Sequence, residues 1–255
     1  MRRSLLLPLL LVTALFAAAC TSASGATVVP GATPGPRATP GTPSVVTLGD
    51  SVAAGAECDC DPFPALYAKD QHAVDVNLAE SGATASDVRD ELPGNSGALA
   101  KAAEVLIMIG ANDVAGTIDD PATYPAAATS VQNDVTATIA GIEKSHSVPV
   151  IVLGYWNVVL DGQVGQETYG PDGVKAAAQA TAMINNALQV AASTNAEAEY
   201  VSTEPAFHGD DGSHDPTDLL AADGDHPNAA GQAAIAALLP PLPGSDSSAA
   251  AVAKG

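Results

Sequence analysis

The chain has 255 residues, carries a formal net charge of −20 and is only 4% aromatic. Nucleic acids and anionic membrane surfaces bind basic patches, so this acidic balance argues against both as partners of the folded surface. Alanine and valine dominate the apolar residues, which favours close packing of helices on a sheet. Neither end has the composition of a core, and roughly 200 residues remain for one domain, a usual size for a single α/β unit.

The first residues of the chain have the form of an export signal. Arg2 and Arg3 precede an apolar stretch that ends in small residues. This pattern is typical of a secretory signal peptide, which we expect at residues 1–19, and it is too short for a transmembrane span.

The cysteine that follows this segment indicates a lipid anchor. Residues 17–20, Ala-Ala-Ala-Cys, resemble a lipobox, in which the cysteine becomes lipid-modified and forms the new N-terminus. We therefore expect a lipid on Cys20 and attachment to the outer side of the cell membrane, with plain secretion as the alternative. Residues 20–43 are rich in Pro, Gly, Ser and Thr, a composition typical of a semi-extended tether.

Short apolar runs then alternate with longer helical patterns. The runs predict strands at residues 45–48, 73–78, 105–109, 148–153 and 199–201. The longer patterns predict helices at residues 64–70, 85–92 with a continuation to 103, 125–145, 174–192 and 228–239. This alternation predicts a three-layer α/β domain at residues 44–240 with a mostly parallel sheet, followed by a disordered tail at 241–255.

Three glycine-containing loops follow predicted strands and belong to the same edge of that sheet. They contain Ser51, Gly82 and Asn112, respectively. Ligands of open parallel sheets bind beyond the carboxyl ends of the strands. We therefore expect these three loops to converge on one site.

Ser51 stands where a strand turns into a helix. A serine hydroxyl is a poor nucleophile until a base accepts its proton, and the backbone N–H at such a turn can donate to a developing oxyanion. Asp50 beside it is equally consistent with a helix N-cap. The side-chain amide of Asn112 either donates to the same oxyanion or caps the turn after its strand.

His226 is the best base in the chain. Asp223 lies three residues before it, where a carboxylate can bind the second ring nitrogen and set the tautomer. Pro227 directly after it fixes the start of a helix. His208 and His214, by contrast, lie in an acidic loop.

Cys58 and Cys60 form the second notable cysteine feature. With Cys20 lipidated, these two remain as a pair in an exported protein, and a short-loop disulfide is the expected state. Reduced thiols are the alternative, and a zinc site lacks the further ligands that it needs.

Four blocks of the sequence, in this order, resemble the blocks of the SGNH (GDSL) hydrolase family, here in the form of a bacterial exported lipoprotein. They are Gly49-Asp50-Ser51 with Gly55, Glu80-Ser81-Gly82, Gly110-Ala111-Asn112-Asp113 and Asp223-x-x-His226-Pro227. The resemblance implies a flavodoxin-like fold with a five-stranded sheet. It further implies Ser51 as nucleophile, His226 as base and Asp223 as its orienter. The implied oxyanion hole consists of the Ser51 and Gly82 N–H groups and the Asn112 side chain.

The expected reaction is hydrolysis of a carboxylic ester through an acyl-Ser51 intermediate, with an acyl or acetyl ester of a lipid or a carbohydrate as substrate. An acyltransferase that uses the same intermediate and a non-catalytic binding protein are the alternatives. We expect a monomer with no metal and no cofactor.

Tyr155 and Trp156, after the fourth predicted strand, either line the substrate pocket or pack under the long loop that follows. That loop, residues 161–172, contains three glycines and is a candidate lid.

Overall fold

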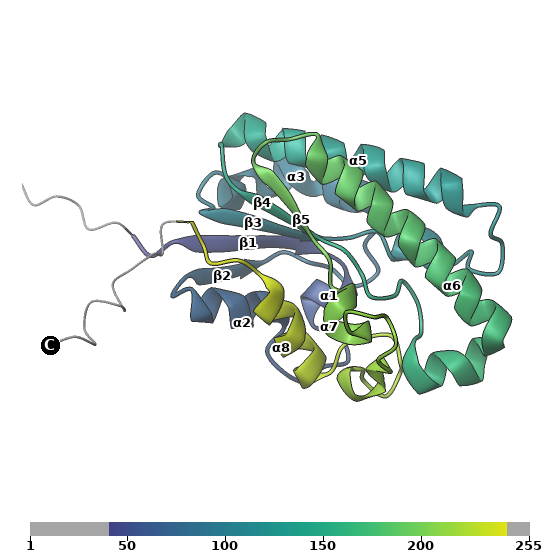
Figure 1. Ribbon diagram of the computed structural model, residues 1–255. Coiled ribbons are helices and arrows are strands. Elements are labelled where there is room, and N and C mark those ends of the chain that lie inside the picture. The colour runs from purple at the N-terminus through teal and green to yellow at the C-terminus, as the bar shows by residue number, and fades with distance from the viewer. Residues whose placement is uncertain (1–40, 244–255) are drawn as a thin grey trace, which may run out of the picture. The chain divides into compact units, whose positions relative to one another are not determined.

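Five parallel strands form the centre of the molecule (Figure 1). This computed structural model describes residues 41–243. The expected signal peptide, Cys20, almost all of the tether and nearly the whole tail lie outside the described residues. The strands are β1 (Ser44–Gly49), β2 (Val74–Asn77), β3 (Glu104–Met108), β4 (Val150–Leu153) and β5 (Ala198–Val201).

The sheet has the order β2-β1-β3-β4-β5, and every neighbouring pair is parallel. β3 and β4 are buried along their whole lengths, as their nearly continuous apolar sequences predict. The edge strand β2 is partly exposed. The α/β fold class and all five predicted strands are confirmed.

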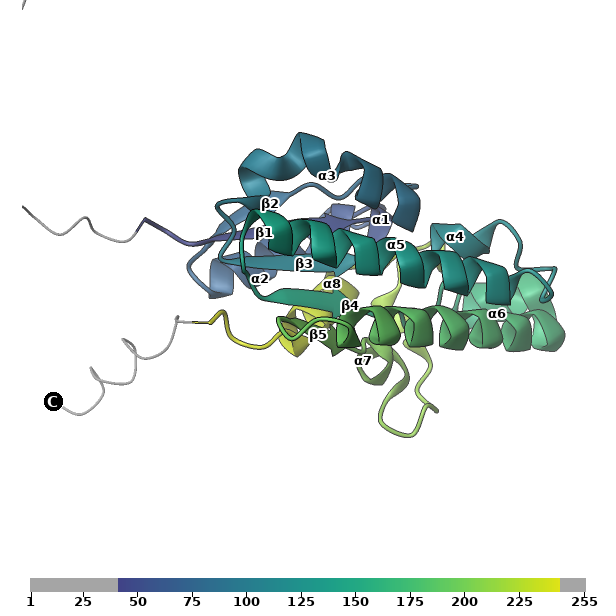
Figure 2. The ribbon, with the colours of Figure 1, turned by 90° about the horizontal axis from the view of Figure 1, so that it is seen from above.

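Helices cover both faces of the sheet. α3 (Ala85–Leu99), α5 (Tyr124–Ser145) and α6 (Gly162–Ser193) lie side by side on one face (Figure 2). α2 (Phe63–Asp70) and α8 (Ala229–Leu238) pack together on the other. In α5 the residues Val131, Val135, Ile139 and Ile142 are buried, a spacing that turns one side of the helix to the core. Among the described helices, none is both long and apolar enough to cross a membrane.

Four short elements were not predicted, because each is shorter than the window in which helical periodicity can be recognised. They are α1 (Ser51–Ala54), α4 (Asn112–Ala115), α7 (Glu204–His208) and the 3₁₀ helix η1 (Pro216–Leu219). Two of them, α1 and α4, begin at the predicted site residues Ser51 and Asn112.

The prediction of a lid loop at residues 161–172 was wrong. α6 starts at Gly162 and bends at Gly170, where φ is 63° and ψ is −178°. The glycines permit close contact rather than flexibility: a Cβ on Gly165 would lie 2.6 Å from the carbonyl oxygen of Leu160. Pro171 directly follows the bend and begins the straight part of the helix, a position that proline tolerates.

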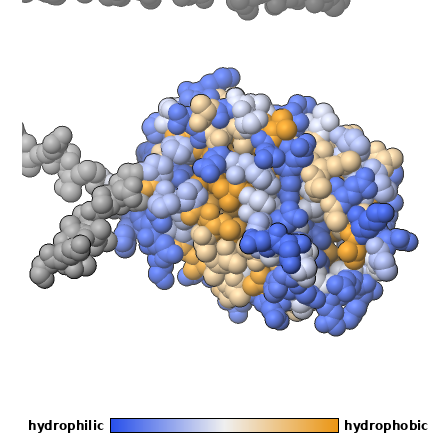
Figure 3. All heavy atoms as spheres, in the orientation of Figure 1, coloured by the Kyte–Doolittle hydropathy of each residue, from blue (hydrophilic) through white to orange (hydrophobic). Residues whose placement is uncertain are grey.

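The face of the domain seen in Figure 3 carries both hydrophilic and apolar areas. Figure 3 shows polar residues over the loop that follows α7 and apolar residues gathered over α8. The exposed side of α8 consists of alanines: Ala229, Ala230, Ala233 and Ala237.

Cys58 and Cys60 lie between α1 and α2. The structure joins their sulfur atoms, and their Cα atoms are 5.1 Å apart, a separation within the usual range for a disulfide. The residues around the pair, Glu57 and Asp59, have φ values of 57° and 48°, so the segment is tightly turned.

Oxidation of this pair is testable by mass spectrometry. We expect the non-reduced peptide that contains Cys58 and Cys60 to be lighter than the reduced form by one hydrogen per cysteine, because the export compartment favours disulfides. The measurement is made on purified protein alkylated before digestion. Rapid alkylation of both thiols in the native protein would contradict the prediction.

Candidate active site

Ser51 is the first residue of α1, at the carboxyl end of β1. The side chain of Asp50 caps this helix by accepting from the N–H of Val52 at 3.1 Å. Gly49 must be small, since a Cβ there would lie 2.6 Å from the carbonyl oxygen of Met108. The chain therefore turns sharply from strand to helix and leaves Ser51 partly exposed at the sheet edge.

Backbone hydrogen bonds hold the loops after β1, β2 and β3 together. The N–H of Asp50 donates to the carbonyl of Met108 at 3.1 Å, and the N–H of Glu80 donates to the carbonyl of Gly49 at 3.0 Å. The expected convergence of these loops is thus observed.

Asn112 connects the third loop to the second. Its Nδ2 donates to the carbonyl of Ala83 at 2.9 Å, next to Gly82, whose φ of 85° favours glycine. The neighbouring carboxylate of Asp113 accepts from the N–H of Ala85 at 3.0 Å. Asn112 makes no side-chain cap on α4, and one of its two amide hydrogens remains available beside Gly82.

His226 and Asp223 form a hydrogen-bonded pair. Nδ1 of His226 lies 2.5 Å from Oδ2 of Asp223. Oδ1 of Asp223 accepts from the backbone N–H groups of Asp225 and His226 at 3.1 and 3.2 Å. Burial acts to raise the pKa of Asp223, but these hydrogen bonds, led by that of His226, outweigh it and lower the pKa below its ordinary value. Nε2 of His226 makes no hydrogen bond within residues 41–243.

Gln232 connects the histidine segment to the serine segment. It is fully buried in α8, donates from Nε2 to the carbonyl of Val52 at 3.1 Å and accepts from the N–H of Phe63 at 2.8 Å. Since α8 directly follows His226 and Pro227, these bonds fix the histidine loop relative to α1. Gln232 was not among the predicted site residues; the signal in the sequence was a lone glutamine in a helix of alanines and aliphatic residues.

Asp50 has a larger role than a cap. It is 1% exposed, and the hydroxyl of Tyr155 donates to its Oδ2. Burial raises the pKa of Asp50 to about 6, although the hydrogen bonds from Tyr155 and Val52 and the nearby His226 act to lower it. Burial also raises the pKa of Tyr155 well above its ordinary value. This pair ties the end of β1 to the segment after β4.

Of the two aromatic residues that were candidates for a pocket, Trp156 lines a cavity and Tyr155 does not. Tyr155 is 1% exposed and faces Asp50 instead of a pocket. Trp156 is 3% exposed, stacks on Phe207 with ring centroids 3.9 Å apart, and lines a cavity between α6 and α7. Within residues 41–243, no group of three or more His, Cys, Asp or Glu side chains is arranged to hold a metal ion.

Solved structures share this fold. A lipase from a goat rumen metagenome matches with a TM-score of 0.62 and 18% identity, over 77% of this chain and 95% of that chain. A catalytic mutant of an acetylxylan esterase from Geobacillus stearothermophilus matches with a TM-score of 0.57 and 18% identity, over 77% and 91%. Phospholipase A1 from Streptomyces albidoflavus matches with a TM-score of 0.53 and 23% identity, over 78% and 100%. At these identities the likeness concerns the fold alone.

Comparison with curated proteins gives no significant match. The model of the GDSL-like lipase/acylhydrolase family matches residues 47–234. This range contains Ser51, Gly82, Asn112, Asp223 and His226, and it covers most of the chain. The chain therefore belongs to the GDSL-like lipase/acylhydrolase family and is an enzyme of the esterase and lipase type.

Proposed function

We propose that this enzyme hydrolyses carboxylic esters through a covalent acyl intermediate on Ser51, with His226 as general base and Asp223 as its orienter. The observation that carries the proposal is the pair His226–Asp223: Asp223 holds Nδ1 at 2.5 Å and leaves Nε2 without a partner among the described residues. An imidazole held in this way can accept a proton at Nε2.

In the first half of the reaction, Nε2 of His226 takes the proton of Ser51 Oγ as the oxygen attacks the ester carbonyl. The resulting oxyanion accepts hydrogen bonds from the N–H groups of Ser51 and Gly82 and from the free amide hydrogen of Asn112. The tetrahedral intermediate collapses, His226 returns the proton to the leaving alcohol, and the acyl group stays on Ser51.

In the second half, water replaces the alcohol. His226 accepts a proton from the water, which attacks the acyl carbon and forms a second oxyanion in the same place. Collapse releases the carboxylic acid, and the proton returns to Ser51. No step requires a metal or a cofactor.

A substrate panel tests the proposal. Purified protein is assayed with p-nitrophenyl esters of increasing chain length and with acetylated sugars, and we expect turnover of at least one class. Failure to hydrolyse any of these, in a protein that shows a cooperative thermal transition, would contradict it.

We further propose that the enzyme is a monomer held at the outer side of the cell membrane by a lipid on Cys20. Within residues 41–243 only two large apolar side chains are exposed, Val74 at 48% and Val190 at 36%, which leaves little surface for a stable dimer. The sequence motif at Cys20 supports the lipid anchor. Two acyl chains on one glycerol give stable attachment, whereas a single chain would be marginal.

Loss of the anchor should release the enzyme. We expect Cys20→Ala to move active protein from the membrane fraction to the medium, measured by ester hydrolysis in each fraction. Wild-type protein recovered only from the medium, or a variant that remains in the membrane fraction, would rule out lipid attachment at Cys20.

A further inference from the structure

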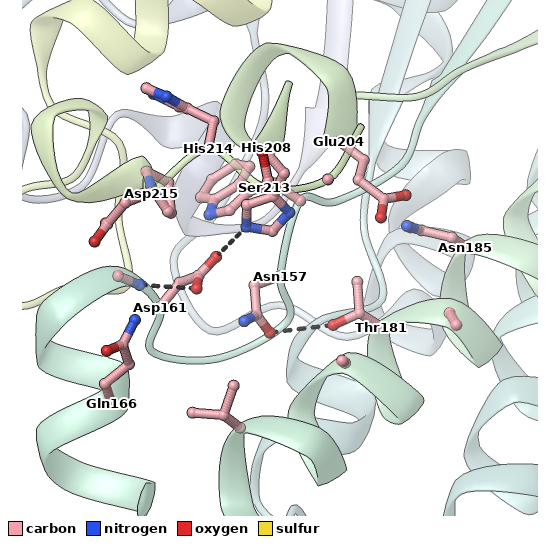
Figure 4. Close-up of a pocket in the computed structure, with 17 residues that line it drawn as sticks. Asn157, Asp161, Gln166, Thr181, Asn185, Glu204, His208, Ser213, His214 and Asp215 are labelled. Atoms are coloured by element: carbon pink, nitrogen blue, oxygen red, sulfur yellow. Dashed lines mark hydrogen bonds and ion pairs between the residues drawn. The ribbon is translucent and has the colours of Figure 1, made fainter. Parts of the chain in front are cut away.

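A cavity of about 560 Å³ lies between the segment after β4, α6, α7 and the loop that leads to η1 (Figure 4). Its volume falls in the range of roughly 300–1,000 Å³ that is usual for small-molecule sites. Neither Ser51 nor His226 lines it. It is therefore distinct from the reacting centre.

One residue that lines the cavity, Asp161, also contacts the loop that contains His226. The backbone N–H of Asp161 donates to the carbonyl of Gly224 at 2.7 Å, and Gly224 stands between Asp223 and His226. Asp161 also lines the cavity, where its carboxylate binds His208. A molecule in the cavity thus lies next to the catalytic loop.

Asn157 presents a fixed donor to the cavity. Its Oδ1 accepts from the backbone N–H of Val158 at 2.9 Å and from Oγ1 of Thr181 at 3.1 Å. A backbone N–H only donates, so this contact identifies the amide oxygen and leaves Nδ2 as the free end. Figure 4 shows the nitrogen of Asn157 turned away from Thr181. Nδ2 makes no hydrogen bond to any described residue.

Two further donors lie on the same lining. Asn185 accepts at Oδ1 from the N–H of Tyr155 and donates from Nδ2 to its carbonyl, both at 2.8 Å, and one amide hydrogen remains. His208 binds Oδ2 of Asp161 through Nε2 at 2.9 Å. That hydrogen bond raises the pKa of His208 and so favours the form in which Nδ1 also carries a hydrogen.

Acceptors alternate with these donors. Glu204 is exposed, its carboxylate has no hydrogen-bond partner in the described part of the chain, and it lines the same cavity as His208 and Asn185 (Figure 4). Asp215 lines the same cavity and binds Thr217 through Oδ1 only. Donors and acceptors therefore stand close together.

This pattern selects the chemistry of the ligand. A cation would face the N–H groups of Asn157 and Asn185, an anion would face the carboxylates of Glu204 and Asp215, and an acyl chain would leave all of them without partners. A hydroxyl group both accepts and donates, so a molecule with several neighbouring hydroxyl groups satisfies both sets.

We infer that this cavity binds a neutral sugar unit and that this unit belongs to an oligosaccharide in which a neighbouring unit carries the ester cleaved at Ser51. The second half of this inference rests on the proposed function, because it requires that the enzyme cleave esters at Ser51. The first half stands on the cavity alone.

The test of binding uses intrinsic fluorescence. Trp156 is the one tryptophan of the chain and lines the cavity, so a ligand there changes its emission without a label. Xylotriose, cellotriose and chitotriose are the probes, and sodium octanoate is the control for an acyl chain. We expect a saturable change with at least one sugar and none with octanoate. The absence of any saturable change with the sugars would overturn the inference.

Asn157→Asp is the informative variant. It keeps the oxygen that accepts from Val158 and Thr181 and removes the N–H donors, so the fold is retained and sugar affinity should fall about tenfold or more. Asn186→Asp is the matched control, since Asn186 is an exposed asparagine of α6 that does not line the cavity, and the sugar affinity of this variant should equal that of wild type. If Asn157→Asp fails to fold, Glu204→Ala replaces it.

An unchanged sugar affinity of Asn157→Asp would place the sugar elsewhere and overturn the inference.

Kinetics then test the link to the reaction: Asn157→Asp should raise KM for acetylated xylotriose and leave KM for p-nitrophenyl acetate unchanged. Sugar binding with equal KM effects on both esters would show a site for free saccharides and overturn the substrate assignment. Sugar binding without any ester hydrolysis would contradict the proposed function instead, and ester hydrolysis without sugar binding would contradict the cavity assignment alone.

Discussion

Replacement of Ser51 by alanine should lower kcat by a factor on the order of 10⁶, to the level of residual binding and oxyanion stabilisation. In the proposed mechanism this hydroxyl forms the covalent bond to the acyl group. The fold should be unaffected, since the Ser51 hydroxyl makes no side-chain hydrogen bond within residues 41–243 and the residue is partly exposed. We therefore expect an unchanged thermal transition together with lost turnover.

His226→Ala should have nearly the same effect, and the double variant should be scarcely slower than either, because the two groups act as a unit.

Labelling with a fluorophosphonate locates the nucleophile directly by peptide mass. Ser81→Ala is the matched control, an exposed serine on a neighbouring loop, and it should label and turn over like wild type. Label on a residue other than Ser51 would refute the assignment.

Asn112→Ala should lower kcat by roughly 10²–10³ and change KM little, because an oxyanion donor acts in the transition state. The structure adds a second effect. The lost hydrogen bond from Nδ2 to the carbonyl of Ala83 should reduce the free energy of unfolding by about 1 kcal/mol. Steady-state kinetics and thermal unfolding of one variant measure both.

A boronic acid that mimics the tetrahedral intermediate separates these effects. Its affinity for Asn112→Ala should fall by a factor similar to that of kcat, while the affinity for the product alcohol stays the same. Reduced stability with kcat and boronate affinity retained would show that Asn112 only holds the Gly82 loop.

The sequence predicted the layers of the fold because buried parallel strands are nearly continuous apolar runs. β3 and β4 show this most clearly. The prediction failed at the start of α6, where Gly162, one of the glycines that predicted a loop, instead allows the helix to approach Thr217: a Cβ there would lie 2.5 Å from Oγ1 of Thr217. A contact between segments is not encoded in local periodicity.

The convergence of the loops that contain Ser51, Gly82 and Asn112 was predictable for a topological reason: parallel strands end at one edge, so residues that follow them are brought together. The side chains that hold these loops in place could not be predicted from the sequence. Tyr155 was expected beside a pocket but donates to Asp50, because the direction of its side chain depends on the turn after β4. The two hydrogen bonds of Gln232 join residues 169 and 180 positions away, a relation that only the folded chain reveals.

The attachment of α8 to α1 through Gln232 also has a consequence for biosynthesis. A ribosome makes Ser51 before His226, and the helix that holds the histidine loop follows both. A nascent chain that lacks α8 also lacks the hydrogen bond from Gln232 to Val52. Under the proposed mechanism, such a chain should not hydrolyse esters until α8 has been made and has packed against α1.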